Sequence, residues 1–150
     1  MSWVEDRLEI LNLIAGYSHA ADGTDAEAYA DCFTDDGAFL GRVGMPDESR
    51  IAGREALLKF HRAAVARRGE VQNRHIQTNT HVVSQTAEAA LVRTYLLVMV
   101  SRGDKPPEPG LTSVYEDELV KTAVGWRISV RRAIPDRKGV LPHNAARVRP

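Results

Sequence analysis

The sequence predicts an α+β fold, because its hydrophobic pattern changes once, from helical to strand periodicity, near residue 73. Segments with helical spacing come first, and long alternating segments joined by short turns follow, which is the order of an α+β domain with an antiparallel meander. The 150 residues contain no repeat, low-complexity stretch or linker. We therefore expect one domain over residues 1–150, with its core over about 3–134 and a C-terminal tail over 135–150.

Helices are predicted over about 3–21, 25–33 and 54–67. Ser2 and Glu5 have the spacing of a capping box, in which a hydroxyl and a carboxylate satisfy free backbone N–H groups at the start of the first helix. Apolar and small residues then recur along this helix at spacings of three and four: Val4, Leu8, Leu11, Ile14, Ala15 and Ser18. This stripe is expected to face the core.

Strands are predicted in five segments: 38–43, 74–85, 88–102, 111–122 and 126–134. Asp35, Asp36 and Gly37 are expected to form a turn, and the polar residues 44–51 a loop. If the resulting sheet curves strongly over the helices, it encloses a pocket.

Composition excludes several classes of partner. The chain has 20 basic and 20 acidic side chains, whereas nucleic-acid-binding domains normally carry a basic surplus. No apolar run approaches the roughly 20 residues of a membrane span. Residues 1–6 lack the order of a signal peptide, and Cys32 alone cannot form an internal disulfide. We expect a cytoplasmic protein that binds neither nucleic acid nor membranes.

His75 is the leading candidate for a proton acceptor, because a neutral imidazole accepts protons near pH 7. In strand register it shares one face with Gln77, Asn79, His81 and Val83. A row of such polar side chains is typical of a polar pocket lining. The alternative is that His75 only bonds the helix end that it covers.

Asp22 precedes Gly23 at the expected end of the first helix, where Asp-Gly is a common turn former. The carboxylate could instead orient a catalytic histidine. His19, three residues earlier, could pair with it, but a surface position is favoured for His19.

No metal or cofactor site is predicted. His75 and His81 would lie about 20 Å apart along a strand, and no further ligands have suitable spacing. The glycines at 41 and 44 lack the strand–loop–helix context of a dinucleotide site. Cys32 is expected to be a buried small hydrophobe.

Five stretches carry a family resemblance in their order and spacing: YSHAADGTDAEAYADCFTDDGAF, IAGREAL, RHIQTN, YEDELVKT and GWRISVRR. Over about residues 3–134 the chain resembles the SnoaL-like branch of the NTF2-like superfamily, whose members are cone-shaped α+β barrels. Within this branch it is similar to scytalone dehydratase and hexachlorocyclohexane dehydrochlorinase, two kinds of cofactor-free lyase.

The resemblance implies a catalytic dyad of His75 and Asp22, with Tyr17 and Arg131 as further pocket residues. Tyr17 could instead pack only its ring, and Arg131 is one of two consecutive arginines, of which one points outward. Asn79 and Tyr115 are expected to bind substrate as pocket-lining residues. The second pocket histidine of the dehydratase has no counterpart within 110–115.

Our first hypothesis is a cofactor-independent lyase, of the dehydratase or eliminase type, acting on a small, mostly apolar organic molecule. An isomerase or cyclase would use the same base, and a non-catalytic small-molecule-binding module would use only the pocket. The broad face of the sheet must also be covered, and the family commonly forms dimers or trimers. We therefore expect a homo-oligomer.

Overall fold

The computed structural model describes residues 2–136, in which helices precede most of the strands, as predicted. The elements in chain order are α1 (Trp3–Asp22), α2 (Ala26–Ala30), β1 (Phe33–Gly41), β2 (Ser49–Ala52), α3 (Arg54–Arg68), β3 (Gln72–Gln85), β4 (Ala89–Ser101), β5 (Glu108–Thr122) and β6 (Gly125–Pro135). Residues 137–150 of the predicted tail lie outside the described residues.

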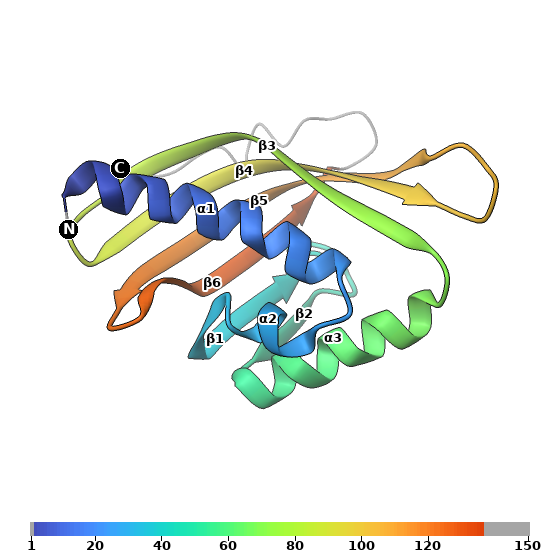
Figure 1. The fold of residues 1–150 in the computed structure, drawn as a ribbon, viewed down its shortest axis with the longest axis horizontal. Coiled ribbons are helices and arrows are strands. Elements are labelled where there is room, and N and C mark those ends of the chain that lie inside the picture. The colour runs from blue at the N-terminus through green and yellow to red at the C-terminus, as the bar shows by residue number, and fades with distance from the viewer. Residues whose placement is uncertain (1, 137–150) are drawn as a thin grey trace.

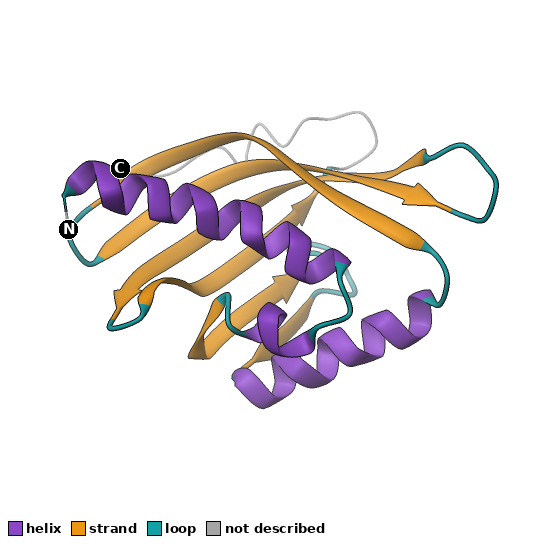
Figure 2. Cartoon of the chain, viewed as in Figure 1, coloured by secondary structure: helices purple, strands orange, loops and turns teal. Residues whose placement is uncertain are grey.

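The strands form one curved sheet in the order β2-β1-β6-β5-β4-β3. Neighbours are antiparallel except β1 and β6, which run parallel. After β2, at one edge of the sheet, the chain passes through α3 to β3 at the opposite edge, and the following strands lead back to β6 beside β1. Figure 1 shows α1 lying along the sheet, with α2 and α3 near its C-terminal end. In Figure 2 the helices lie together in front of the strands. The predicted α+β cone is therefore confirmed.

The first helix is capped as predicted, but it is rotated about its axis, so that a different face from the predicted one packs on the sheet. The Ser2 hydroxyl and Glu5 carboxylate form the capping box. The face that packs on the sheet contains Ile10, Ile14 and Tyr17, and it also contains Asp6. The predicted inward stripe was right at Ile14 and wrong at Val4, Leu8, Leu11 and Ala15, which are exposed. Asp6 is tolerated inside because Lys121 Nζ and Trp126 Nε1 donate to it.

Three predicted boundaries were also wrong. The second helix ends at Ala30, because the chain enters β1 at Phe33. Residues 35–37 lie inside β1 at an irregularity in its pairing with β6, where a bulge takes the place of the expected turn. Part of the expected loop 44–51 forms β2, which pairs with β1 over a short length. The sequence of this segment has no hydrophobic alternation from which a strand could be predicted.

Alternate residues of β3 do not face the same side of the sheet along the whole strand. The register with β4 shifts between Thr78 and His81, and Asn79 has a positive φ of 54° at this bulge. Before the bulge His75 and Gln77 face the helices, and after it Thr80 and Val82 do. Strict alternation therefore does not hold beyond residue 78, and His81 is exposed.

The core lies between α1, α2 and the concave side of the sheet. Its largest fully buried apolar side chains include Trp126, Tyr29 and Ile10. Within residues 2–136, no helix combines the length and apolarity that a membrane span requires.

Candidate active site

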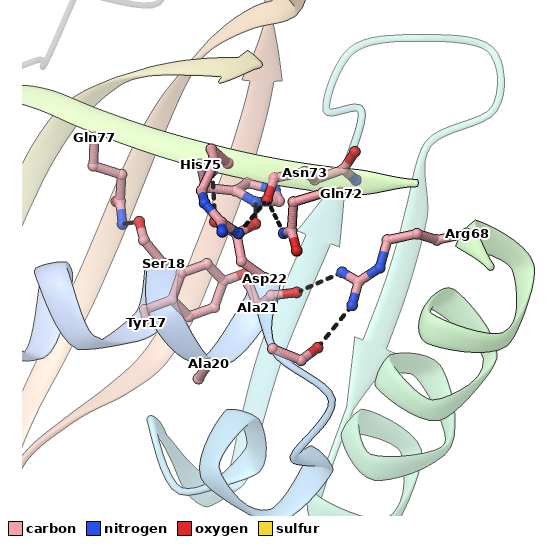
Figure 3. A network of polar contacts seen from close by, with 12 residues as sticks. Tyr17, Ser18, Ala20, Ala21, Asp22, Arg68, Gln72, Asn73, His75 and Gln77 are labelled. Carbon is pink, nitrogen blue, oxygen red and sulfur yellow. Dashed lines mark hydrogen bonds and ion pairs between the residues drawn. The ribbon is translucent and has the colours of Figure 1, made fainter. Parts of the chain in front are cut away.

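The candidate site lies where the end of α1 meets the beginning of β3. Ser18 and Asp22 are four residues apart on the helix, and Gln77 and His75 are two apart on the strand. These separations correspond to about 6 Å and about 6.6 Å, so the two pairs match when the elements run in opposite directions. Gln77 Nε2 donates to Ser18 Oγ at 2.8 Å, and His75 bonds Asp22 one step further along (Figure 3).

His75 and Asp22 are joined twice. The imidazole Nδ1 of His75 lies 2.5 Å from Asp22 Oδ1, and the backbone N–H of His75 donates to Asp22 Oδ2 at 2.8 Å. Because a carboxylate accepts hydrogen bonds, the neutral form of this imidazole carries its proton on Nδ1 and its lone pair on Nε2. Among the described residues Nε2 has no hydrogen-bond partner. The geometry is that of a carboxylate-oriented general base.

The α3 helix holds the end of α1 that carries Asp22. His61 Nε2 lies 3.1 Å from the carbonyl oxygen of Ala20 and donates to it. Arg68 donates to the carbonyl oxygens of Ala21, at 3.5 Å, and Gly23, at 2.9 Å (Figure 3). The last carbonyls of a helix lack partners within it, so these donors complete the last turn of α1 and fix the position of Asp22.

Beside the dyad lies a cavity of about 280 Å³. This is roughly twice the cavity volume of about 150 Å³ that accommodates benzene in an engineered protein. Aromatic rings form much of its wall: Tyr17, Tyr29, Phe39, Phe60 and Tyr115. His75, His61 and Asn73 add polar groups. The cavity therefore has room for a flat molecule of one or two rings that also carries polar groups.

The tyrosine hydroxyls of the cavity remain protonated at neutral pH. Burial raises the pKa of Tyr17, and it holds the pKa values of Tyr29 and Tyr115 well above 10.0. The hydroxyl oxygens of Tyr17 and Tyr29 lie 3.5 Å apart. The protonated hydroxyls can donate hydrogen bonds to a ligand oxygen that gains negative charge.

Arg131 lies behind this wall. Its guanidinium is fully buried and donates to both carboxylate oxygens of Asp117, each at 2.6 Å. It also stacks on the rings of Tyr17 and Tyr115, at 3.8 and 4.3 Å from their centroids. Burial by itself would lower the pKa of Arg131, but the Asp117 carboxylate raises that pKa above its usual value. Arg131 is a permanent cation that supports two tyrosines.

The predicted site residues therefore divide into three groups. His75, Tyr17 and Tyr115 line the cavity, and Asp22 bonds His75 from behind. Arg131 is not among the side chains that line it, and the structure places this residue behind the rings of Tyr17 and Tyr115. Asn79 does not line it either, because the bulge leaves its side chain exposed. His19 is exposed, in agreement with the surface position that the sequence analysis favoured.

Sequence reasoning missed His61, Arg68 and Tyr29 as cavity residues. A signal for His61 existed, since it lies four residues after Leu57 on the inward face of α3. Burial lowers its pKa and keeps the imidazole neutral near pH 7. The Arg68 side chain lines the cavity only because α3 packs against the end of α1, which no local pattern reveals.

Within residues 2–136, no three His, Cys, Asp or Glu side chains gather closely enough to hold a metal ion. Cys32 is buried, and burial raises the pKa of its thiol to about 11. It is therefore a poor nucleophile at neutral pH.

Residues 3–132 match the SnoaL-like domain family. The structure is similar to that of a variant of Rv3472, a function-unknown protein from Mycobacterium tuberculosis, with 32% identity, a TM-score of 0.78, and coverage of 91% of this chain and 75% of that one. An NTF2-like protein with a cystatin-like fold from Novosphingobium aromaticivorans is 25% identical, with a TM-score of 0.77 and coverage of 95% and 88%.

ActVI-ORFA from Streptomyces coelicolor is also 25% identical, with a TM-score of 0.75 and coverage of 87% of this chain and 96% of that one. None of the curated proteins matches the chain. The family match over 3–132 and the 32% identity to one solved structure identify this chain as a member of the SnoaL-like domain family, within the NTF2-like superfamily.

Proposed function

We propose that the chain is a cofactor-independent enzyme in which His75 is the general base for a small, largely apolar molecule. The observation that carries the proposal is the 2.5 Å hydrogen bond between His75 Nδ1 and Asp22 Oδ1 at the wall of the cavity. It leaves Nε2 as the proton acceptor, and Asp22 stabilises the imidazolium that forms. A base of this kind accelerates proton transfer by roughly 10²–10⁴.

In the proposed step, Nε2 takes a proton from a carbon next to a carbonyl group of the ligand. The electron pair of the broken C–H bond moves to the carbonyl oxygen, which gains negative charge. A hydroxyl of Tyr17, Tyr29 or Tyr115 donates a hydrogen bond to this oxygen. Arg131 acts only through the two rings on which it stacks.

The enolate then has three fates. In a lyase it expels a leaving group from the neighbouring carbon, and the His75 imidazolium returns the proton to that group. In an isomerase the enolate is protonated at another carbon, and in a cyclase it attacks a second carbonyl of the same molecule. We favour the lyase because the motifs that carry His75 and Asp22 resemble those of two cofactor-free lyases. Family membership supports a small-molecule pocket and is compatible with all three fates.

Deuterium exchange tests the shared first step without a known substrate. One- and two-ring ketones are incubated with the protein in D₂O, and loss of the proton next to the carbonyl is followed by NMR. We expect exchange with the wild type and a loss of roughly 10²–10⁴ in its rate in His75→Asn. Release of a leaving group identifies a lyase, and a product that differs from the ligand in mass only by its incorporated deuterium identifies an isomerase or cyclase.

The thermal midpoint of His75→Asn should stay close to that of the wild type, which makes the loss of rate a chemical effect. If ligands bind in the cavity and return unchanged, without exchange, the non-catalytic binding module is the better description. Equal exchange rates in wild type and His75→Asn would also contradict the base mechanism.

We also propose that a second copy of the chain covers the outer face of the sheet. Ile76 on β3, Tyr95 on β4 and Leu111 on β5 are 45%, 56% and 50% exposed, which is unusual for large apolar side chains on neighbouring strands. Light scattering should give a dimer or trimer, and Tyr95→Lys should shift the mass toward the monomer. A monomeric wild type would contradict this proposal.

A further inference from the structure

The charged side chains of the cavity have one sign. Arg67 and Arg68 line it at the C-terminal end of α3, and among residues 2–136 no Asp or Glu lines it. Asp22 stands behind His75, where the imidazole and the backbone N–H occupy both its carboxylate oxygens. The wall that faces a ligand is therefore positively charged on one side.

The arginines of α3 differ in how their charges are balanced. Arg54 pairs with Glu27 at 2.8 Å and with Asp31 at 2.7 Å, and Arg62 pairs with Glu27 at 3.3 Å. Within the described part of the chain, Arg67 and Arg68 have no carboxylate partner. The two arginines outside the cavity are thus neutralised by ion pairs, whereas the two that line it are not.

Arg68 is held in place without being neutralised. Its partners are the carbonyl oxygens of Ala21 and Gly23, which carry only partial charge. The C-terminus of a helix contributes about −0.5 of an elementary charge, less than the full charge of one guanidinium. Arg67 is exposed beside it. A net positive charge remains at this end of the cavity, next to Asn73 and His75.

We infer that the cavity takes an organic anion, a ring system whose carboxylate or comparable acidic group lies against Arg67 and Arg68. The aromatic walls hold the rings, and the guanidinium groups, which no carboxylate of residues 2–136 neutralises, supply charge-assisted hydrogen bonds to the acidic group. The inference rests on the proposed function only in treating this anion as a substrate. Binding of the anion does not need the base.

A matched pair of ligands tests this charge preference. 2-Naphthoate and 2-naphthamide have the same rings and nearly the same shape, but only the first is charged at neutral pH. Equilibrium dialysis should show the wild type binding 2-naphthoate at least about tenfold more tightly. The difference should narrow as ionic strength rises, because exposed charges are screened.

Arg67→Glu places a negative charge at the cavity and leaves the hydrogen bonds of Arg68 intact. It should weaken 2-naphthoate binding several-fold and leave 2-naphthamide binding unchanged. Arg68→Gln should abolish most of the preference, and Arg68→Lys should restore part of it by returning the charge. Arg62→Gln, on the same helix but outside the cavity, is the control and should retain the wild-type preference.

The inference is overturned if the wild type does not bind 2-naphthoate, if it binds both ligands with equal affinity, or if Arg67→Glu keeps the full wild-type preference. A loss in Arg62→Gln as large as in Arg67→Glu would also overturn it, because the effect would then reflect overall charge. The base mechanism is tested by a different measurement. Deuterium exchange that survives in His75→Asn contradicts the proposed function and leaves the binding preference standing.

Discussion

Two pairs of a carboxylate and a basic side chain differ in what the basic group can do. Arg131 and Asp117 are both fully buried, and the guanidinium cannot release its proton. The His75 side chain, paired with Asp22, is 20% exposed and borders the cavity, and an imidazole can gain and lose a proton near neutral pH. The first pair stabilises the wall, and the second has the properties of a reactive site.

The comparison shows why an inward-facing carboxylate alone does not mark function. Asp6, Asp22 and Asp117 all lie on inward faces with strong partners. The Lys121 and Trp126 donors hold the pKa of Asp6 below its usual value, and Asp6 does not border the cavity. Of the three carboxylates, Asp22 is the one whose partner keeps a free nitrogen beside a space large enough for a ligand.

The largest expected effect comes from breaking the reactive pair. In Asp22→Asn the introduced amide can donate to His75 Nδ1, which favours the tautomer with a proton on Nε2 and no lone pair at the cavity. The deuterium-exchange rate should fall by about 10²–10⁴, and the thermal midpoint should change little because the amide oxygen would still accept from the backbone of His75. A variant that retains more than half of the wild-type rate would show that Asp22 does not orient the base.

Breaking the structural pair should instead make the protein unfold more easily. Arg131→Met leaves the Asp117 carboxylate buried without compensation and should lower the free energy of unfolding by about 3–5 kcal/mol in urea titrations. The double variant Arg131→Met/Asp117→Leu should recover most of this loss, because no charge remains buried. A double variant as unstable as the single one would mean that stacking on Tyr17 and Tyr115, rather than charge, stabilises the wall.

His61 should make the stability depend on pH. Burial lowers its folded-state pKa below 6.5, so the unfolded chain binds more protons in the window below that value. The contribution of His61 is complete above about pH 6.5 and is lost as the pH falls toward the lowered pKa. The thermal midpoint should therefore fall as the solution is acidified from neutral pH, and His61→Gln, which keeps a donor for Ala20, should flatten the decline. An identical slope in both proteins would contradict this role.

The smallest expected effect is at Asn79. A glycine adopts the positive φ of 54° freely, so Asn79→Gly should change the free energy of unfolding by less than about 1 kcal/mol, in the stabilising direction. Affinity for 2-naphthoate should stay at the wild-type value, because the exposed side chain does not line the cavity. A clear loss of affinity would restore Asn79 to the binding site.

Hydrophobic periodicity was sufficient to predict much of the fold, and sequence motifs pointed to part of the candidate site. Within residues 2–136, helical and strand periods located the three helices and the long strands, because each buries a face with a regular repeat. The motif RHIQTN and the Asp-Gly end of α1 pointed to His75 and Asp22, since the resemblance pairs them. The orientation of α1 was not predictable, because Asp6 enters the core only with partners 115 and 120 residues away.

The sequence by itself determined the α+β order and the capped first helix, and the family resemblance pointed to His75 and Asp22, which a hydrogen bond joins in the structure. Tertiary structure decided which side chains share their cavity. A bulge at Asn79 turned that residue outward, and the ion pair with Asp117 fixed Arg131 behind two tyrosines. The packing of α3 on α1 brought in His61 and Arg68. Each of these outcomes depends on contacts between residues distant in the chain, which short-range periodicity does not encode.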